Sequence, residues 1–246
     1  MRTTSEVHGV ALTSEQTGIV TKQLELHAQI MKPYEISLGE IGIAGAGAEK
    51  KIEVHPNVMR PEITGSSRCL ASFIAMEPSL YRGKRVLDMG CGCGIQGIVM
   101  GVKGARQVAW ADISHEAVLN TLINVRRFHF DANLVYESDL FSEVAGEYDL
   151  IVFNHPFFPG QPIPDKVVSR AMLDEGSLIC RFLAAAPRHL AERGTLLMPF
   201  YDLAGHVNDP EERASEFGFD VERLADLRNE IGPQTGIIHI YRLHIP

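Results

Sequence analysis

The sequence predicts an α/β protein built on a doubly wound, mostly parallel sheet of about seven strands with an antiparallel edge. Three observations support this prediction. From residue 66 onward, short apolar segments alternate with helical segments, a pattern that requires a parallel sheet with right-handed crossovers. A glycine-rich turn follows the first of these apolar segments. The last two strand segments follow each other without a long helix between them, which indicates an antiparallel pair at the edge.

The first 55 residues are expected to form a small α/β appendage, and residues 56–246 the main domain. The appendage is predicted to contain a helix at 13–31 and strands at 35–38 and 51–54. Between the strands, residues 42–47 are rich in glycine but lack the Lys-Ser/Thr ending of a phosphate-binding loop, so they are interpreted as a hairpin turn. We expect the appendage to fold over the ligand crevice or to mediate a homodimer.

The first helix is predicted from its apolar stripe and from the proline that follows it. Val20, Leu24 and Met31 fall on one face of this helix, and Pro33 ends it. His27 lies off the stripe, so a surface position is expected for it.

In the main domain, strands are assigned to short apolar runs and helices to longer segments with apolar residues three or four apart. Helices are predicted at 66–76, from the glycine turn to 102, and at 115–128, 177–193 and 210–217. Strands are predicted at 85–89, 107–111, 133–136, 148–153, 195–200, 220–224 and 236–244. A proline-rich loop at 156–164 contains two phenylalanines at its start and is expected to wall the substrate site.

Composition narrows the class of partner. The 246 residues are 45% apolar, and 23 basic against 31 acidic residues give a net charge of −8. A broad nucleic-acid surface normally needs a basic balance, so nucleic acid is disfavoured as a partner. No apolar run reaches membrane-spanning length and the start lacks a signal core, so a cytoplasmic protein without membrane contact is expected. The four cysteines form no paired Cys-x-x-Cys units, and no metal site is expected.

The most informative segment is the turn after the strand at 85–89. Asp88 ends this strand, and glycines follow at positions 90, 92, 94 and 97. Glycine permits a tight turn and lets a ligand approach the backbone, and ligands of open α/β sheets bind at the carboxyl ends of the strands. Asp88 is therefore expected to point its carboxylate into the crevice. A tight strand–helix turn without a ligand is the structural alternative.

Two cofactor interpretations fit this turn. Gly92-x-Gly94-x-x-Gly97, with Asp112 downstream, matches the dinucleotide fingerprint. Asp88-x-Gly90-x-Gly92-x-Gly94 matches the pattern of S-adenosylmethionine (SAM) enzymes. Electrostatics favours SAM, because a carboxylate suits the ammonium of its methionine part and sits poorly beside a pyrophosphate. Asp112 can accept both ribose hydroxyls, while Asp139 is placed to bind the adenine amine with Leu140 against the ring.

With these residues the chain resembles the class I SAM-dependent methyltransferases, over roughly residues 55–200. The resemblance is greatest to the small-domain group, which includes release-factor glutamine and ribosomal-RNA guanine N-methyltransferases. It implies a Rossmann-like fold and SAM as the cofactor. Residues 59–64 resemble the group's Arg-Pro-Glu-Thr segment with Ile63 as an extra residue, and Asn154-His155-Pro156-Phe157 resembles its Asn-Pro-Pro-Tyr/Phe signature.

The resemblance implies a set of site residues. The expected catalytic residues are Asn154, His155 and Phe157. The expected cofactor-binding residues are Glu62, Thr64, Asp88, Gly90, Cys91, Gly92, Gly94, Asp112, Ile113, Asp139, Leu140 and Asn154.

The family chemistry explains the signature. A planar amide or amino nitrogen is a poor nucleophile, and carbonyl oxygens of the Asn and the Pro region accept its hydrogens while the aromatic ring stacks on its plane. The methyl group then moves in line from sulfur to nitrogen and leaves S-adenosylhomocysteine. His155 departs from the signature by replacing a proline. It can be a base near neutral pH, or a tolerated substitution whose ring points aside.

The sequence leaves several functions open. N-methylation of a small molecule or a protein side chain is the first expectation. A SAM-consuming cyclase is the main rival: with His155 as base, the amine of SAM would close azetidine-2-carboxylate and release methylthioadenosine. A non-catalytic SAM-binding module and a dinucleotide dehydrogenase are further alternatives, and in the dehydrogenase a replacement of Asp88 should matter little.

Overall fold

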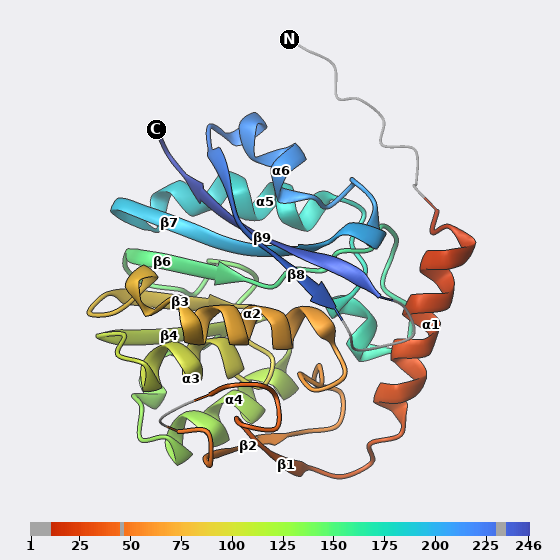
Figure 1. Cartoon of the computed structure of the whole chain (residues 1–246), viewed down its shortest axis with the longest axis horizontal. Coiled ribbons are helices and arrows are strands. Elements are labelled where there is room, and N and C mark those ends of the chain that lie inside the picture. The colour runs from red at the N-terminus through yellow and green to blue at the C-terminus, as the bar shows by residue number, and fades with distance from the viewer. Residues whose placement is uncertain (1–10, 45–46, 230–234) are drawn as a thin grey trace.

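A computed structural model describes residues 11–44, 47–229 and 235–246, so part of the predicted hairpin turn, 45–46, lies outside the described residues. The fold is a seven-stranded sheet of order β5-β4-β3-β6-β7-β9-β8, beside a two-stranded sheet β1-β2 (Figure 1). Neighbours from β5 to β7 pair in parallel, whereas β9 is antiparallel to both β7 and β8. This confirms the predicted doubly wound sheet with an antiparallel edge.

The elements follow the alternating order expected from the sequence. The strands are β1 (Tyr34–Ser37), β2 (Lys51–Val54), β3 (Arg85–Met89), β4 (Gln107–Asp112), β5 (Val135–Glu137), β6 (Tyr148–Phe153), β7 (Leu190–Tyr201), β8 (Asp220–Asn229) and β9 (Gly236–His244). The helices are α1 (Ser14–Ala28), α2 (Gly65–Met76), α3 (Ile95–Val102), α4 (His115–Arg127), α5 (Ser177–Ala185) and α6 (Pro210–Arg213). Short 3-10 helices include η3 (Val167–Ala171), η4 (Ala186–Arg188) and η6 (Ala214–Phe217).

The strand order reverses at β3, because β4 lies on one side of it and β6 on the other. Right-handed crossovers place α3 and α4 on one face of the sheet and α5 and α6 on the opposite face. Helix α2 packs beside α3, and α5 contacts α6. The carboxyl ends of β3 and β6 therefore diverge into the crevice where open α/β sheets bind ligands.

The largest differences from the predicted ranges are in α5, β7 and β8. The helix predicted to reach residue 193 ends at Ala185 and passes through η4, because Pro187 cannot donate the next helical hydrogen bond. Strand β7 then starts at Leu190. Strand β8 continues to Asn229 instead of ending at 224, since it pairs with β9 along its whole length and absorbs an irregularity between Arg223 and Ala225.

Helix α1 stands beyond the carboxyl ends of the parallel strands (Figure 1). Its start is fixed by a capping box in which the side chains of Thr13 and Gln16 bind each other's backbone. Two predictions for this helix were wrong. Met31 is 81% exposed, beyond the helix end, and His27 is buried with 7% exposure, because the last turn packs against the loop that carries Arg60.

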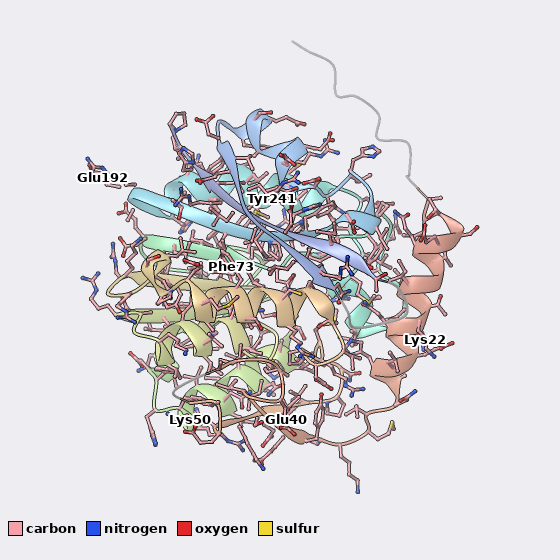
Figure 2. All side chains as sticks on the ribbon, viewed as in Figure 1. Lys22, Glu40, Lys50, Phe73, Glu192 and Tyr241 are labelled. Carbon is pink, nitrogen blue, oxygen red and sulfur yellow. The ribbon has the colours of Figure 1, made fainter. Side chains whose placement is uncertain are left out.

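The β1–β2 hairpin packs against α4, and its apolar residues belong to the same buried cluster as the sheet. The fully buried amides of Asn120 and Asn124 each donate to the carbonyl oxygen of Glu53, at 2.8 and 2.7 Å. Figure 2 shows Lys22 and Glu192 at the periphery of the molecule, while Phe73 lies between α2 and the sheet. Among the described residues, no helix combines the length and apolar character required to cross a membrane.

Candidate functional site

A cavity of about 380 Å³ opens at the carboxyl ends of β3, β4 and β6, within the size range of small-molecule sites. Its floor is the glycine turn after β3, and its sides come from the start of α2, the loop after β6, and η3. Helix α1 contributes Gln23 to the rim, and the C-terminal hairpin contributes Asn229. The cavity thus lies at the carboxyl ends of the strands, where the sequence predicted a ligand crevice.

The glycines of the floor are required by backbone geometry. Gly90, Gly92 and Gly94 have φ values of +63°, +58° and +82°, in the left-handed region that favours glycine. At Gly97 the constraint is contact instead, because a Cβ there would stand 2.1 Å from the indole nitrogen of Trp110. Gly90 and Gly92 line the cavity and leave its floor open to a ligand, whereas Gly94 lies behind the wall as the N-cap of α3.

Asp88 does not point into the cavity, which corrects the expectation for its carboxylate. Its Oδ2 accepts the backbone N–H of Gly97 at 2.8 Å, and the side chain is 1% exposed. Burial raises the pKa of the Asp88 carboxyl well above its usual range, the bond from Gly97 opposes this, and nearby Asp112 adds to it. The carboxylate ties strand β3 to the first turn of α3 beneath the glycine turn. The electrostatic argument for a direct Asp88–ammonium contact therefore fails.

Asp112, at the end of β4, does line the cavity. Its Oδ2 accepts the N–H of Gly92 and its Oδ1 accepts the N–H of Ser114, each at 2.9 Å. Burial raises the pKa of Asp112, and the two N–H groups counteract this shift. Each oxygen keeps a further lone pair, so the carboxylate can still accept two hydroxyl groups side by side.

The loop after β5 forms the adjoining wall. Asp139 and Leu140 both line the cavity, and Asp139 Oδ2 is bound by Arg181 at 2.5 Å on the exposed side. Leu140 has a φ of +51° and is held by Ser138, whose hydroxyl donates to the Leu140 carbonyl at 2.7 Å. Ile113 is 57% exposed at the cavity wall. Ile113 and Leu140 offer apolar contact surface of the kind that an adenine ring requires.

In the segment that resembles Arg-Pro-Glu-Thr, some side chains line the cavity and others hold neighbouring elements together. Thr64 lines the cavity and donates from Oγ1 to the carbonyl oxygen of Arg60 at 2.8 Å. Glu62 does not line it: Oε1 accepts from the Tyr34 hydroxyl at 2.6 Å and from Arg60 at 2.7 Å. Arg60 in turn donates to the carbonyl oxygen of Leu26 at 2.9 Å. The expected contact of Glu62 with the cofactor is therefore replaced by an anchor for α1.

The Asn-His-Pro-Phe segment follows β6 on the opposite side of the glycine turn. Asn154, His155, Pro156 and Phe157 all line the cavity. The Asn154 amide donates from Nδ2 to the hydroxyl of Ser67 at 3.1 Å, which leaves its carbonyl oxygen as the acceptor of the group. Phe157 packs edge-on against Phe200, with ring centres 5.5 Å apart.

His155 is 2% exposed and is held by its neighbours. Its Nε2 donates to the carbonyl oxygen of Asn208 at 2.8 Å, and its ring packs against Phe153, Phe157 and Phe200. Burial lowers the pKa of His155 to about 4, against hydrogen bonds that raise it. The ring is therefore neutral near pH 7 and a weak base, which removes the support for the proton acceptor in the cyclase hypothesis.

Several cavity residues were not predicted. Ser67, Arg170 and Asn229 come from segments without a motif, and Gln23 comes from a helix that was read for its apolar stripe alone. Cys91 was predicted and lines the floor, where its thiol contacts Thr121 Oγ1 at 3.3 Å. Tyr201, the last residue of β7, also lines the cavity. Within the described ranges, no group of three or more His, Cys, Asp or Glu side chains could hold a metal ion.

Comparisons with known proteins place this chain in a family. The profile of the methyltransferase small domain matches residues 51–203. The chain is 28% identical to the Methanocaldococcus jannaschii protein named "Putative protein N5-glutamine methyltransferase", over 72% of this chain and 89% of that protein. It is 40% identical to ribosomal RNA small subunit methyltransferase C of Chromohalobacter salexigens, over 43% of this chain and 32% of that protein.

A solved structure shares the fold. The 16S rRNA N2 methyltransferase of T. thermophilus, in complex with AdoMet and guanosine, superposes with a TM-score of 0.58 at 18% identity. The match covers 88% of this chain and 52% of that chain. The present chain thus spans only about half of this structure and a third of the curated RNA enzyme, but most of the archaeal protein. With the profile matched over more than half of its length, the chain belongs to the methyltransferase small domain family and is a SAM-dependent transferase of class I.

Proposed function

We propose that this chain methylates the nitrogen of a planar amide in a protein side chain. The observation that carries this proposal is the position of Asn154 on the cavity wall. Its amide is oriented by Ser67, so that a carbonyl oxygen is available for the hydrogens of an acceptor nitrogen. Pro156 and Phe157 stand beside it and supply a flat, apolar surface for the plane of the acceptor.

The cavity fits SAM on the evidence of its floor and wall. The left-handed Gly90 and Gly92 expose backbone, and a Cβ at Gly90 would come within 3.0 Å of the Phe153 ring. Asp112 would hold the ribose, with Ile113 and Leu140 against the adenine. When bound, SAM supplies a methyl group already activated by the sulfonium. The protein therefore needs only to position the acceptor and exclude water.

Two findings favour a protein acceptor over RNA. The relative that this chain spans almost completely carries a glutamine methyltransferase name, whereas the RNA enzyme is matched over only 32% of its length. The net charge of −8 gives little attraction for a phosphate backbone.

The test follows the products of the purified chain by mass spectrometry. The chain is incubated with SAM alone, with unstructured glutamine-containing peptides, or with a small-subunit rRNA fragment. S-adenosylhomocysteine formed with a peptide, together with a methylated glutamine, is the expected result. Turnover with the RNA fragment only would refute the acceptor class. Methylthioadenosine and azetidine-2-carboxylate without any acceptor would instead establish the cyclase, and SAM binding without turnover in any arm would favour a binding module.

Asn154→Ala should lower kcat for methylation of the peptide about 100-fold or more, because the acceptor nitrogen loses the group that orients its lone pair. The affinity for SAM, measured by calorimetry, should change by less than about threefold, since the glycine floor and Asp112 are intact. Asn133→Ala, at an exposed position beyond the cavity, serves as the matched control and should keep wild-type kcat. Unchanged turnover in Asn154→Ala would remove the acceptor role of this side chain.

A further inference from the structure

We propose that His155 and Asn208 form a buried clamp that positions the acceptor wall, residues 154–158, for methyl transfer. Neither residue is assigned a contact with the reacting atoms. They act by holding the backbone that presents Asn154 and Phe157 to the cavity. This inference rests on the proposed function for its catalytic consequence, but the clamp itself has a readout that needs no turnover.

The His155 half of the clamp is the hydrogen bond from its ring to the backbone of Asn208. With Nε2 donating to the Asn208 carbonyl oxygen at 2.8 Å, the ring is fixed in one orientation. The ring stacks on Phe200, with ring centres 6.2 Å apart, and meets the edge of Phe157, with ring centres 5.2 Å apart. These contacts leave the imidazole little room to rotate. His155 also precedes Pro156, and a residue before proline is restricted to extended conformations. The side chain therefore locks a backbone that is already stiff.

The Asn208 half reaches back to the same wall. Asn208 has no exposed surface, and its Nδ2 donates to the carbonyl oxygens of Asp174 at 2.8 Å and Phe157 at 3.2 Å. One amide thus joins the acceptor wall to the segment 172–174. These two stretches are also paired through their backbones, because the N–H of Phe158 donates to Met172 and the N–H of Asp174 donates to Phe158, both at 3.0 Å.

The pairing of the two residues is reciprocal: His155 binds the backbone of residue 208, and the side chain of Asn208 binds the backbone of the wall. The connection after β7 is thereby coupled to the acceptor wall across some fifty residues of sequence. Among the described residues, Nδ1 of His155 and Oδ1 of Asn208 are buried without a hydrogen-bond partner. Burying such atoms is unfavourable, so an apolar pair of the same size would be the more stable filling if packing were the only role.

His155→Phe tests the clamp, because it keeps the ring volume and the stacking but removes the donor. Hydrogen exchange, read by mass spectrometry on the folded protein without ligand, should become at least tenfold faster at the amides of Phe158 and Asp174. In the peptide assay, kcat should fall about 10- to 100-fold while the affinity for SAM changes less than about threefold. His155→Gln, which restores a side-chain N–H donor, should recover most of both losses.

His189→Phe is the matched control: this histidine stacks on Phe141 with ring centres 4.4 Å apart, and it directly precedes β7, at the opposite end of that strand from Phe200. It should leave exchange at Phe158 and kcat unchanged.

Wild-type exchange at both amides in His155→Phe would overturn the clamp, whatever the outcome for the proposed reaction. If SAM affinity and kcat fell together, His155 would only contribute to packing and the positioning role would be refuted. If the pH–rate profile lost a histidine ionisation in the variant, His155 would act as a base instead. Faster exchange in a protein that methylates no amide would refute the proposed function and leave the clamp standing.

Discussion

At the residue scale, Gly97 shows how closely one position of the turn is constrained. Helix α3 crosses β4 at this glycine, over the indole of the fully buried Trp110. In Gly97→Ala the added methyl would collide with a ring that cannot move aside, and the free energy of unfolding should fall by about 1–3 kcal/mol. Urea denaturation measures this change. Gly18→Ala, on the exposed side of α1 with nothing within 4 Å, is the matched control and should raise the free energy of unfolding by up to about 1 kcal/mol. Equal stability of Gly97→Ala and the wild type would contradict the packing argument.

Residue types were predictable from the sequence, but side-chain directions were not. The spacing of the glycines and of Asp112 predicted a turn and a cavity wall, because these depend on local backbone geometry. Asp88 was placed in the cavity from its position at the end of a strand, and Glu62 from the family resemblance. In the structure they bind the backbone of Gly97 and the guanidinium of Arg60, partners that lie in other elements. A single sequence contains no signal for such tertiary partners.

The burial of His27 gives a pH-dependent stability. Burial, with Arg60 nearby, lowers the pKa of His27 from 6.5 to about 4. The unfolded chain takes up a proton near pH 6.5 while the folded chain stays neutral, so stability is full above that pH and is lost as the pH falls toward 4. Relative to His27→Gln, the wild type should lose about 1.4 kcal/mol of unfolding free energy per pH unit between pH 6 and 4.5. A stability difference between the wild type and His27→Gln that stays constant over this pH range would contradict the assignment.

At the scale of elements, strands were predicted more closely than helix ends. The ranges of β2, β3, β6 and β9 agree with the prediction, because each is a short apolar or alternating run bounded by turn residues. The end of α5 was misplaced, since apolar periodicity continues past Pro187 into the strand that follows. The length of β8 depends on pairing with β9, a contact that periodicity alone does not contain.

Helix α1 should respond to ligand as one unit. It carries Gln23 on the cavity rim and is held at both ends by hydrogen bonds. Near its start, the Gln16 amide donates to the carbonyl oxygen of Leu203 at 3.2 Å. Near its end, the carbonyl oxygen of Leu26 accepts from Arg60. S-adenosylhomocysteine in the cavity should therefore slow amide hydrogen exchange in α1, because opening of the helix away from the rim becomes less frequent. The outer edge strand β8, at 220–224, is the internal control and should exchange at an unchanged rate. Identical rates in α1 with and without ligand would show that it does not close the cavity.

At the scale of the whole molecule, the buried core is continuous across residue 55, where the sequence predicted a boundary between appendage and main domain. Ile52 and Val54 have no exposed surface and share one buried cluster with the strands of the large sheet. The carbonyl of Glu53 is the hydrogen-bond acceptor for two fully buried amides of α4. The hairpin therefore contributes to the same core as the main domain, and α1 adds the buried Ile19 and Val20 to that cluster. Composition and periodicity cannot reveal this continuity, because both segments are short, amphipathic and precede the repeating strand–helix pattern.

Two truncations separate these contributions. A chain that begins at residue 34 lacks α1 and should still unfold cooperatively, with a lower midpoint and weaker binding of S-adenosylhomocysteine. A chain that begins at residue 56 also lacks the hairpin, so the amides of Asn120 and Asn124 lose buried partners and the cluster loses Ile52 and Val54. We expect this shorter chain to show no cooperative transition in thermal unfolding followed by circular dichroism. A sharp transition in the 56–246 chain would instead establish residues 1–55 as a separable appendage, and the loss of ligand affinity would then have to be assigned to that appendage as a whole.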